Sequence, residues 1–120
     1  MKSFVISLVL FSLLTATIVL NYSYINKCSE FLIGTSEKLS FEAEDAGGIK
    51  ELEKFWDKNR DIIGLSVSYR EIDHFCETLI SLRSYYESGN RSEFENSRAI
   101  LIDAAEELAR LERFSVGNIF

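Results

Sequence analysis

An unbroken apolar run opens this chain. Between Phe4 and Leu20 there is no charged residue, and the polar side chains in that run are hydroxyls that can hydrogen-bond within their own helix in lipid. As a helix the run rises about 25 Å, and the shoulder formed by residues 21–25 extends it to the thickness of a hydrocarbon core. Tyr22 and Tyr24 then lie where membrane proteins carry an aromatic belt. The pattern predicts a membrane anchor over residues 1–24, with lipid contacts through residues 4–20.

Two other interpretations of the run stay open. A cleaved secretion signal has a shorter apolar core and small residues at its cleavage site, whereas Leu14-Thr15-Ala16 places Leu where that site needs a small residue. A lipoprotein signal is disfavoured because Lys27 precedes Cys28. The remaining alternative is a buried helix of a soluble protein. We favour the uncleaved anchor.

The flanking charges indicate an orientation. Lys2 favours the cytoplasmic side for the short N-terminal tail, although Lys27 and Lys38 on the other flank weaken this bias. We expect a single-pass protein of the cell membrane, with its N-terminus in the cytoplasm and a domain of residues 25–120 outside.

Beyond the anchor, apolar residues recur every three or four positions, which is typical of helices that bury one face. The chain has no proline, so glycines are expected to mark the helix ends. Gly34 should weaken a stalk that continues the anchor, and Gly47-Gly48 should end it. Helices are predicted at about 25–46, 49–62, 68–88 and 91–114. Their inward positions are Ile25, Cys28, Leu32, Thr35, Leu39, Ala43 and Ala46; Ile49, Leu52, Phe55, Trp56 and Ile63; Ile72, Phe75, Cys76, Leu79, Leu82 and Tyr86; and Phe94, Ser97, Leu101, Ala104, Leu108 and Leu111.

The third and fourth helices are separated only by a short turn. Gly89 is the expected C-cap, and Asn90 or Ser92 is the expected N-cap. So short a turn requires an antiparallel hairpin, which the second helix and the stalk would cover. The predicted fold class is all-α, a single N-terminal transmembrane helix continuing into a small antiparallel three- or four-helix bundle. A dimer formed through the stalk would bury the same stripe.

Charge excludes one class of partner. All of the 19 acidic residues, and all but one of the 13 Lys and Arg residues, follow the anchor, so that part carries a net charge of about −7. Nucleic acid binding requires a basic surface, so we expect no nucleic acid partner. Cys28 and Cys76 could pair in an oxidising exterior, but each is first interpreted as a small apolar residue of a helix.

The order of several short motifs resembles a known family. These are Phe55-Trp56-Asp57-Lys58, Tyr69-Arg70-Glu71-Ile72-Asp73, the Gly89-Asn90 turn and a final Asn118-Ile119-Phe120. With one N-terminal anchor, they resemble a family of short bacterial proteins classed only as a domain of unknown function, found mainly in Gram-positive spore formers. The family pattern has a His shortly before the Glu-Ile-Asp element, where this chain has Tyr69. The resemblance implies the topology and a bacterial setting, and it transfers no catalytic or binding residue.

No set of residues predicts catalysis. Glu71 and His74 have the spacing that di-iron bundles use, but His74 is the only histidine and a metal site would need further inward ligands. Asp73 and Glu77 are neighbours on one helix turn and are expected to face water. Gly47-Gly48 lacks the lysine and hydroxyl of a phosphate-binding loop. We therefore expect no enzyme, no cofactor, no metal and no catalytic residue.

Two features could serve recognition. Lys50, Lys54 and Lys58 repeat every fourth residue and would form a basic ridge able to touch anionic lipid or an acidic partner. The nearby acids, Glu51, Glu53 and Asp57, are expected to neutralise it.

Aromatic side chains are the second feature. Trp56 and Tyr86, with Phe55, Phe75 and Tyr85, could line a ligand pocket between helices, although aromatic residues at helical spacing more often form core. The apolar tail of residues 114–120 either packs back on the bundle, which we favour, or uses Ile119 and Phe120 to dock a partner.

The leading hypothesis is a non-enzymatic protein-interaction or structural module on a bitopic membrane protein. Its partner would be another membrane protein or a second copy of the chain. The alternative is an extracytoplasmic ligand-binding sensor that signals through a partner.

Overall fold

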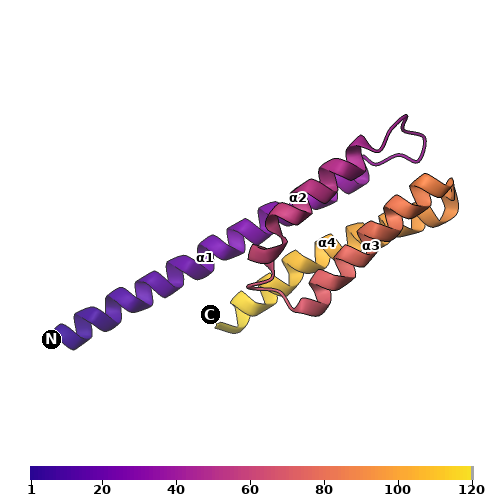
Figure 1. Ribbon diagram of the computed structural model, residues 1–120. Helices are drawn as coiled ribbons and strands as arrows, with labels where there is room; N and C mark the ends of the chain where they lie inside the picture. The colour runs from indigo at the N-terminus through magenta and orange to yellow at the C-terminus, as the bar shows by residue number, and fades with distance from the viewer. Residues whose placement is uncertain (120) are drawn as a thin grey trace.

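The molecule is a narrow rod of four helices in which the first helix extends far beyond the others (Figure 1). This computed structural model describes the backbone of residues 1–119 and the side chains of residues 1–111. The helices are α1 (Lys2–Glu37), α2 (Gly47–Ile63), α3 (Tyr69–Ser88) and α4 (Arg91–Ile119), and the whole measures 68 × 22 × 20 Å. The prediction of an all-α chain with a long N-terminal apolar helix and a small bundle is confirmed.

Helix α1 has two halves with opposite environments. Its first half projects alone, and the large apolar side chains there are exposed, from Phe4 at 71% to Leu20 at 70%. From Ile25 onward one face of the same helix is buried. Of the helices that the structure describes, α1 alone is long and apolar enough to be a membrane anchor or a signal sequence. We call the packed part of the molecule, from Asn21 onward, the head.

Small side chains bring the second half of α1 close to α4. Ser29 and Ser36 are buried on α1, opposite a face of α4 that includes Ala105. The Ser29 hydroxyl donates to the Ala105 carbonyl oxygen at 2.6 Å. Arg98 of α4 donates to the carbonyl oxygen of Glu37, at the end of α1, at 3.2 Å. The two helices are therefore antiparallel over the whole head.

Aromatic residues join α2 to its neighbours. Trp56, which is 1% exposed, packs on Phe75 of α3 with ring centroids 4.1 Å apart. Phe55 stacks on Phe31 of α1, also at 4.1 Å. These contacts confirm that the Ile49–Ile63 apolar stripe faces the bundle, and they place α2 against both α1 and α3.

The prediction that the stalk helix reaches residue 46 was wrong. Helix α1 ends at Glu37, and the turn that follows buries Leu39 and packs Phe41 against the core, which closes the far end of the bundle. Gly47-Gly48 begins α2 instead of ending the stalk. The Asp45 carboxylate accepts from the Gly47 N–H at 2.9 Å, and a Cβ on Gly48 would lie 2.8 Å from Leu39 Cδ2, so a side chain there would displace the end of Leu39.

One further feature of the stalk helix, its inward positions, differs from expectation. Ser36 is buried on its inner face, whereas Thr35 is only half-buried and Ala43 is exposed beyond the helix end. Gly34 lies within the helix without interrupting it, because packing against α4 supplies stabilisation that outweighs the low helix propensity of one glycine.

The predicted α3–α4 hairpin is confirmed. Gly89 has a φ of 75°, the left-handed conformation of a helix C-cap. The Asn90 side chain accepts from the Glu93 N–H at 3.2 Å, so Asn90 and not Ser92 is the N-cap. The predicted end of the fourth helix near 114 was wrong, because α4 continues to Ile119.

Two glycine substitutions should act in opposite directions. Gly89→Ala forces an L side chain into the left-handed region and should lower the free energy of unfolding by about 1 kcal/mol. Gly34→Ala, in open space in mid-helix, should raise it by about 0.5–1 kcal/mol. Denaturant unfolding of the full chain in detergent micelles, followed by circular dichroism, measures both. Equal effects of the two substitutions would contradict the assigned turn.

Candidate functional site

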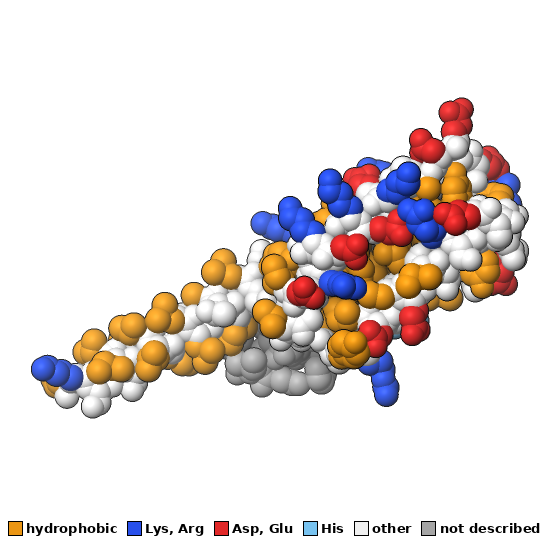
Figure 2. Space-filling model, in the orientation of Figure 1, with side chains coloured by type: hydrophobic (Ala, Val, Ile, Leu, Met, Phe, Trp, Pro, Cys, Tyr) orange, Lys and Arg blue, Asp and Glu red, His pale blue; other side chains and the backbone are white. Residues whose placement is uncertain are grey.

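The lysines of α2 form an exposed basic ridge, which we define as Lys50, Lys54 and Lys58. All three side chains are exposed, and spacing by four residues places them on one face. Within residues 1–111, no ion pair involves any of them. Figure 2 shows basic side chains in a row over α2. The ridge is therefore available to a partner.

The expectation that Glu53 neutralises this ridge was wrong. Glu53 turns toward α3, where Arg83 Nε donates to its two carboxylate oxygens at 3.1 and 3.0 Å and Nη2 donates at 2.5 Å. Arg83 also donates to Glu87 at 3.0 Å. The hydrogen bonds that Arg83 donates to Glu53, and then to Glu87, raise the pKa of Arg83 above its usual value. A forked bond to Arg83 holds the carboxylate more firmly than an exposed lysine could. Sequence spacing along α2 could not reveal this partner on α3.

The ridge runs along the long axis of the molecule. Helix α2 is antiparallel to α1, since the Tyr24 hydroxyl donates to Asn59 while Phe31 stacks on Phe55. Lys58 is thus the end of the ridge nearer the bare half of α1, and Lys50 is about 12 Å farther along. The ridge therefore runs parallel to the bare apolar segment of α1, and we call this orientation upright.

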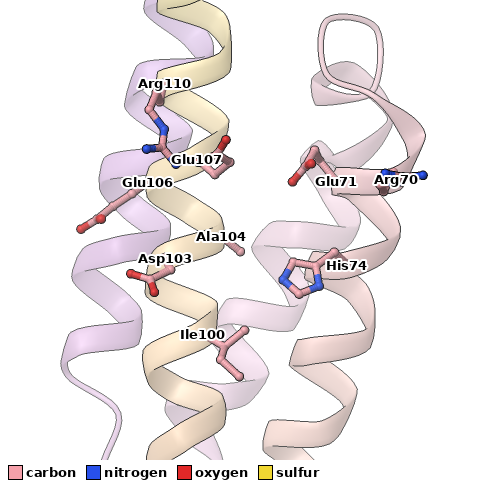
Figure 3. A pocket seen from close by; sticks show the side chains of 9 residues that line it. All are labelled: Arg70, Glu71, His74, Ile100, Asp103, Ala104, Glu106, Glu107 and Arg110. Atoms are coloured by element: carbon pink, nitrogen blue, oxygen red, sulfur yellow. Dashed lines mark ion pairs between the residues drawn. The ribbon is translucent and has the colours of Figure 1, made fainter.

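A groove of about 900 Å³ lies between α3 and α4. Figure 3 shows Glu71 and His74 projecting from α3 toward α4, and Ile100 and Ala104 on the facing side of α4. Glu107 forms an ion pair with Arg110 on the same helix, and Arg70 points away from α4 (Figure 3). The chain segments that meet here are about thirty residues apart, so only the register of the hairpin brings them together.

This groove does not assemble a metal centre. Glu71 and His74 share it, but among the residues that the structure describes no group of three His, Cys, Asp or Glu side chains is placed to hold a metal ion. Asp73 and Glu77 are exposed on the outer side of α3, as expected.

The aromatic residues proposed as a ligand pocket belong to the packed interior. Trp56 Nε1 donates to Cys76 Sγ at 2.9 Å, and the half-buried Tyr86 donates its hydroxyl to the Ala43 carbonyl oxygen at 2.7 Å. Neither side chain lines the α3–α4 groove. Neither lines a second groove of about 340 Å³ beside α1 and α2. Their present contacts are those of core residues.

The two cysteines are free thiols. Cys28 is buried against the core at 4% exposure, and Cys76 is half-buried. Burial raises the pKa of the Cys28 thiol, and a hydrogen bond with Tyr24 opposes this effect. Both serve as core side chains, which agrees with the first interpretation of the sequence. The proposed contact residues Ile119 and Phe120 lie outside the side chains that the structure describes.

The chain belongs to the family described as a domain of unknown function (DUF4363), whose model matches residues 19–119. The match covers the head and the last residues of the apolar run, and its description carries no functional assignment. No curated protein and no solved structure matches the chain. The resemblance of the sequence to a family of unknown function is therefore confirmed at that level.

Alkylation of the Cys28 thiol tests whether this side chain is buried. Because alkylation requires the thiolate, and burial both shields Cys28 and raises its pKa, we expect iodoacetamide to leave Cys28 unmodified in the folded protein at neutral pH. The reaction should become faster as the pH rises toward the raised pKa. Peptide mass spectrometry before and after denaturation measures this. Rapid modification of Cys28 in the folded chain would contradict its burial in the core.

Proposed function

We propose that this chain is a single-pass membrane protein whose head is a non-enzymatic module for binding a neighbouring membrane protein. The observation that carries the proposal is the continuity of α1. One helix is bare over its apolar half and packed along α4 over the other half. A partner bound to the head would thus be held beside the bilayer, because no flexible linker separates anchor from head.

The segment next to the apolar run supports an anchor over a cleaved signal. Residues 21–24 are helical and half-buried. Asn21 donates to Ser66 and Tyr24 donates to Asn59, so both ends of this segment are tied to the α2 side of the head. Removal of residues 1–24 would therefore deprive the head of these contacts.

The direction of the basic ridge supports a protein partner. An upright ridge exposes all three lysines to a protein that lies beside the head. A flat lipid surface would contact only the Lys58 end of the ridge. The acidic flank of an adjacent protein would complement all three lysines, which steers association at low ionic strength. The partner that we propose is therefore an acidic face of another membrane protein.

The remaining features follow from this topology. We place the N-terminus in the cytoplasm and the head outside, on the basis of Lys2, in the bacterial cell membrane that the sequence resemblance implied. The proposal includes no catalytic residue, cofactor or nucleic acid. The sensor alternative gains no support from the structure, because Trp56 and Tyr86 are occupied by contacts within the core.

Reversing the ridge should abolish partner binding. A photo-reactive phenylalanine analogue at Glu51, an exposed position beside the ridge, should form an adduct with the partner in native membranes. We expect Lys54→Glu with Lys58→Glu to reduce that adduct at least tenfold, since two attractive charge pairs become repulsive. Raising the salt concentration should weaken the adduct formed by the unsubstituted ridge.

Arg70→Glu is the matched control. It reverses an exposed basic residue of α3 outside the ridge, so the adduct should persist. The analogue placed at Ile80, an exposed residue of α3, should give no such adduct. An adduct that survives reversal of the ridge would contradict the proposed binding face.

A further inference from the structure

The two ends of the head differ in charge. At the far end, the turn after α1 carries Lys38, Glu42, Glu44 and Asp45, and the α3–α4 turn lies between Glu87 and Arg91. At the end nearer the bare half of α1, the turn between α2 and α3 has no charged residue from Ile62 to Tyr69. Figure 2 shows acidic side chains along the visible face of the head, with several at the end farthest from the bare half of α1. This difference requires an explanation, because water contacts both ends of an ordinary soluble bundle.

The uncharged turn lies level with the end of the apolar run. The Asn21 side chain donates to the Ser66 hydroxyl, which fixes the turn beside the residue that follows Leu20. Apolar side chains on and beside this turn are exposed, with Leu65 at 85%, Tyr69 at 78% and Ile62 at 48%. A turn with this composition is poorly suited to water.

Helix α4 reaches the same level. Ser29 lies opposite Ala105, and Glu37 lies opposite Arg98. The two helices are thus antiparallel, and each step of one residue along α1 corresponds to a step of about one residue back along α4. Carried on toward the N-terminus of α1, this register places residue 113 level with about residue 21, and residue 119 level with about residue 16. Figure 1 shows the end of α4 passing the α2–α3 turn alongside the bare half of α1.

The charges of α4 end at that level. Arg113 is the last charged residue, and 114–119 has none. The backbone of this segment is helical, and it extends about 8 Å past the level of Leu20. Helices that lie in a membrane interface penetrate by about 5–10 Å. Three uncharged segments, residues 3–26, 62–69 and 114–119, therefore converge on one plane.

We propose that the turn 62–69 and the helix end 114–119 form a seat that is immersed in the lipid interface of the bilayer that α1 crosses. The inference rests on the proposed anchor, and it adds a second and third point of membrane contact. The bilayer is the occupant that fits, because the seat begins where the transmembrane run of α1 emerges. Lipid would cover Leu65 and Ile62, which are exposed in the structure.

This seat constrains how the head can move. An anchor alone would let the head tilt and rotate freely about α1. Three contacts that are not in line restrict that motion, so the basic ridge stays upright relative to the membrane. The seat thus explains how a small head could present one face consistently to a partner.

Tryptophan fluorescence in vesicles tests the seat. The full chain would be reconstituted in phosphatidylcholine vesicles with and without lipid brominated near the carbonyl end of the acyl chain, which quenches tryptophan in the interface. The chain has one tryptophan, and Trp56 is buried about 10 Å from the end of α2 at which the seat begins, so it supplies the same background for every probe, which the unsubstituted chain measures. Probes would be introduced one at a time as Leu65→Trp and Val116→Trp, with Tyr69→Trp as a second probe of the turn.

Two further substitutions serve as controls. Ile80→Trp replaces another exposed apolar residue, 68% exposed, on α3 about 17 Å from the turn. Phe11→Trp, in the middle of the apolar run, reports insertion of the anchor itself in a second set of vesicles whose lipid is brominated near the methyl end of the acyl chain. We expect the brominated lipid to remove most of the added emission at positions 65, 69 and 116, and none of it at position 80. Emission maxima at the seat positions should be blue-shifted relative to position 80.

The outcomes separate the two proposals. Quenching at position 11 without quenching at 65, 69 and 116 would overturn the seat and leave the anchor standing. Absence of quenching at position 11 would overturn the anchor and the seat together. Quenching at position 80 equal to that at 65 would also overturn the seat, because the head would then lie on its side.

Discussion

The antiparallel packing of α1 against α4 is the constraint on which the rest of this structure depends. Serine and alanine side chains allow the two helices to approach closely, and the Ser29 hydroxyl bonds directly to the α4 backbone. Because the same α1 helix continues as the bare apolar segment, this interface fixes the direction of the apolar segment relative to the head. Loss of the interface would detach the head from its support even with every helix intact.

Other features of the head are consequences of that interface. Helix α2 adds a cover over α1 and α3 through Trp56 and Phe55, and the turn after α1 closes the far end with Leu39. The register between α1 and α4 also determines which residues stand near the membrane. All four helices lie roughly parallel (Figure 1). The basic ridge is therefore upright, and the uncharged seat lies at the level where α1 would emerge from the membrane.

The sequence predicted the parts of the fold that depend on local pattern. Four helices, the Gly89 turn and the inward stripes of α2, α3 and α4 follow from periodicity and capping. The end of α1 could not be found in this way, because Gly47-Gly48 reads equally well as a helix stop or as a close approach to Leu39. Ser29 and Ser36 were missed on the inner face of α1 because small polar residues give no hydrophobic signal.

The candidate sites also differ in whether local sequence pattern predicts them. The ridge of Lys50, Lys54 and Lys58 could be read from spacing on one helix, and its exposure agrees with that reading. The pairing of Glu53 with Arg83, the groove containing His74 and the common level of three uncharged segments all depend on which residues face each other across helices. A single sequence does not contain that information in its local pattern.

The central claim is that α1 stays intact as one helix that joins membrane to head. The most direct test is the mass of the N-terminal peptide of the mature protein, measured by mass spectrometry after separating membranes from the medium. This account predicts that residues 1–20 are retained and that the protein is found in the membrane fraction. A mature chain that begins beyond Leu20 and is found in the medium would contradict it.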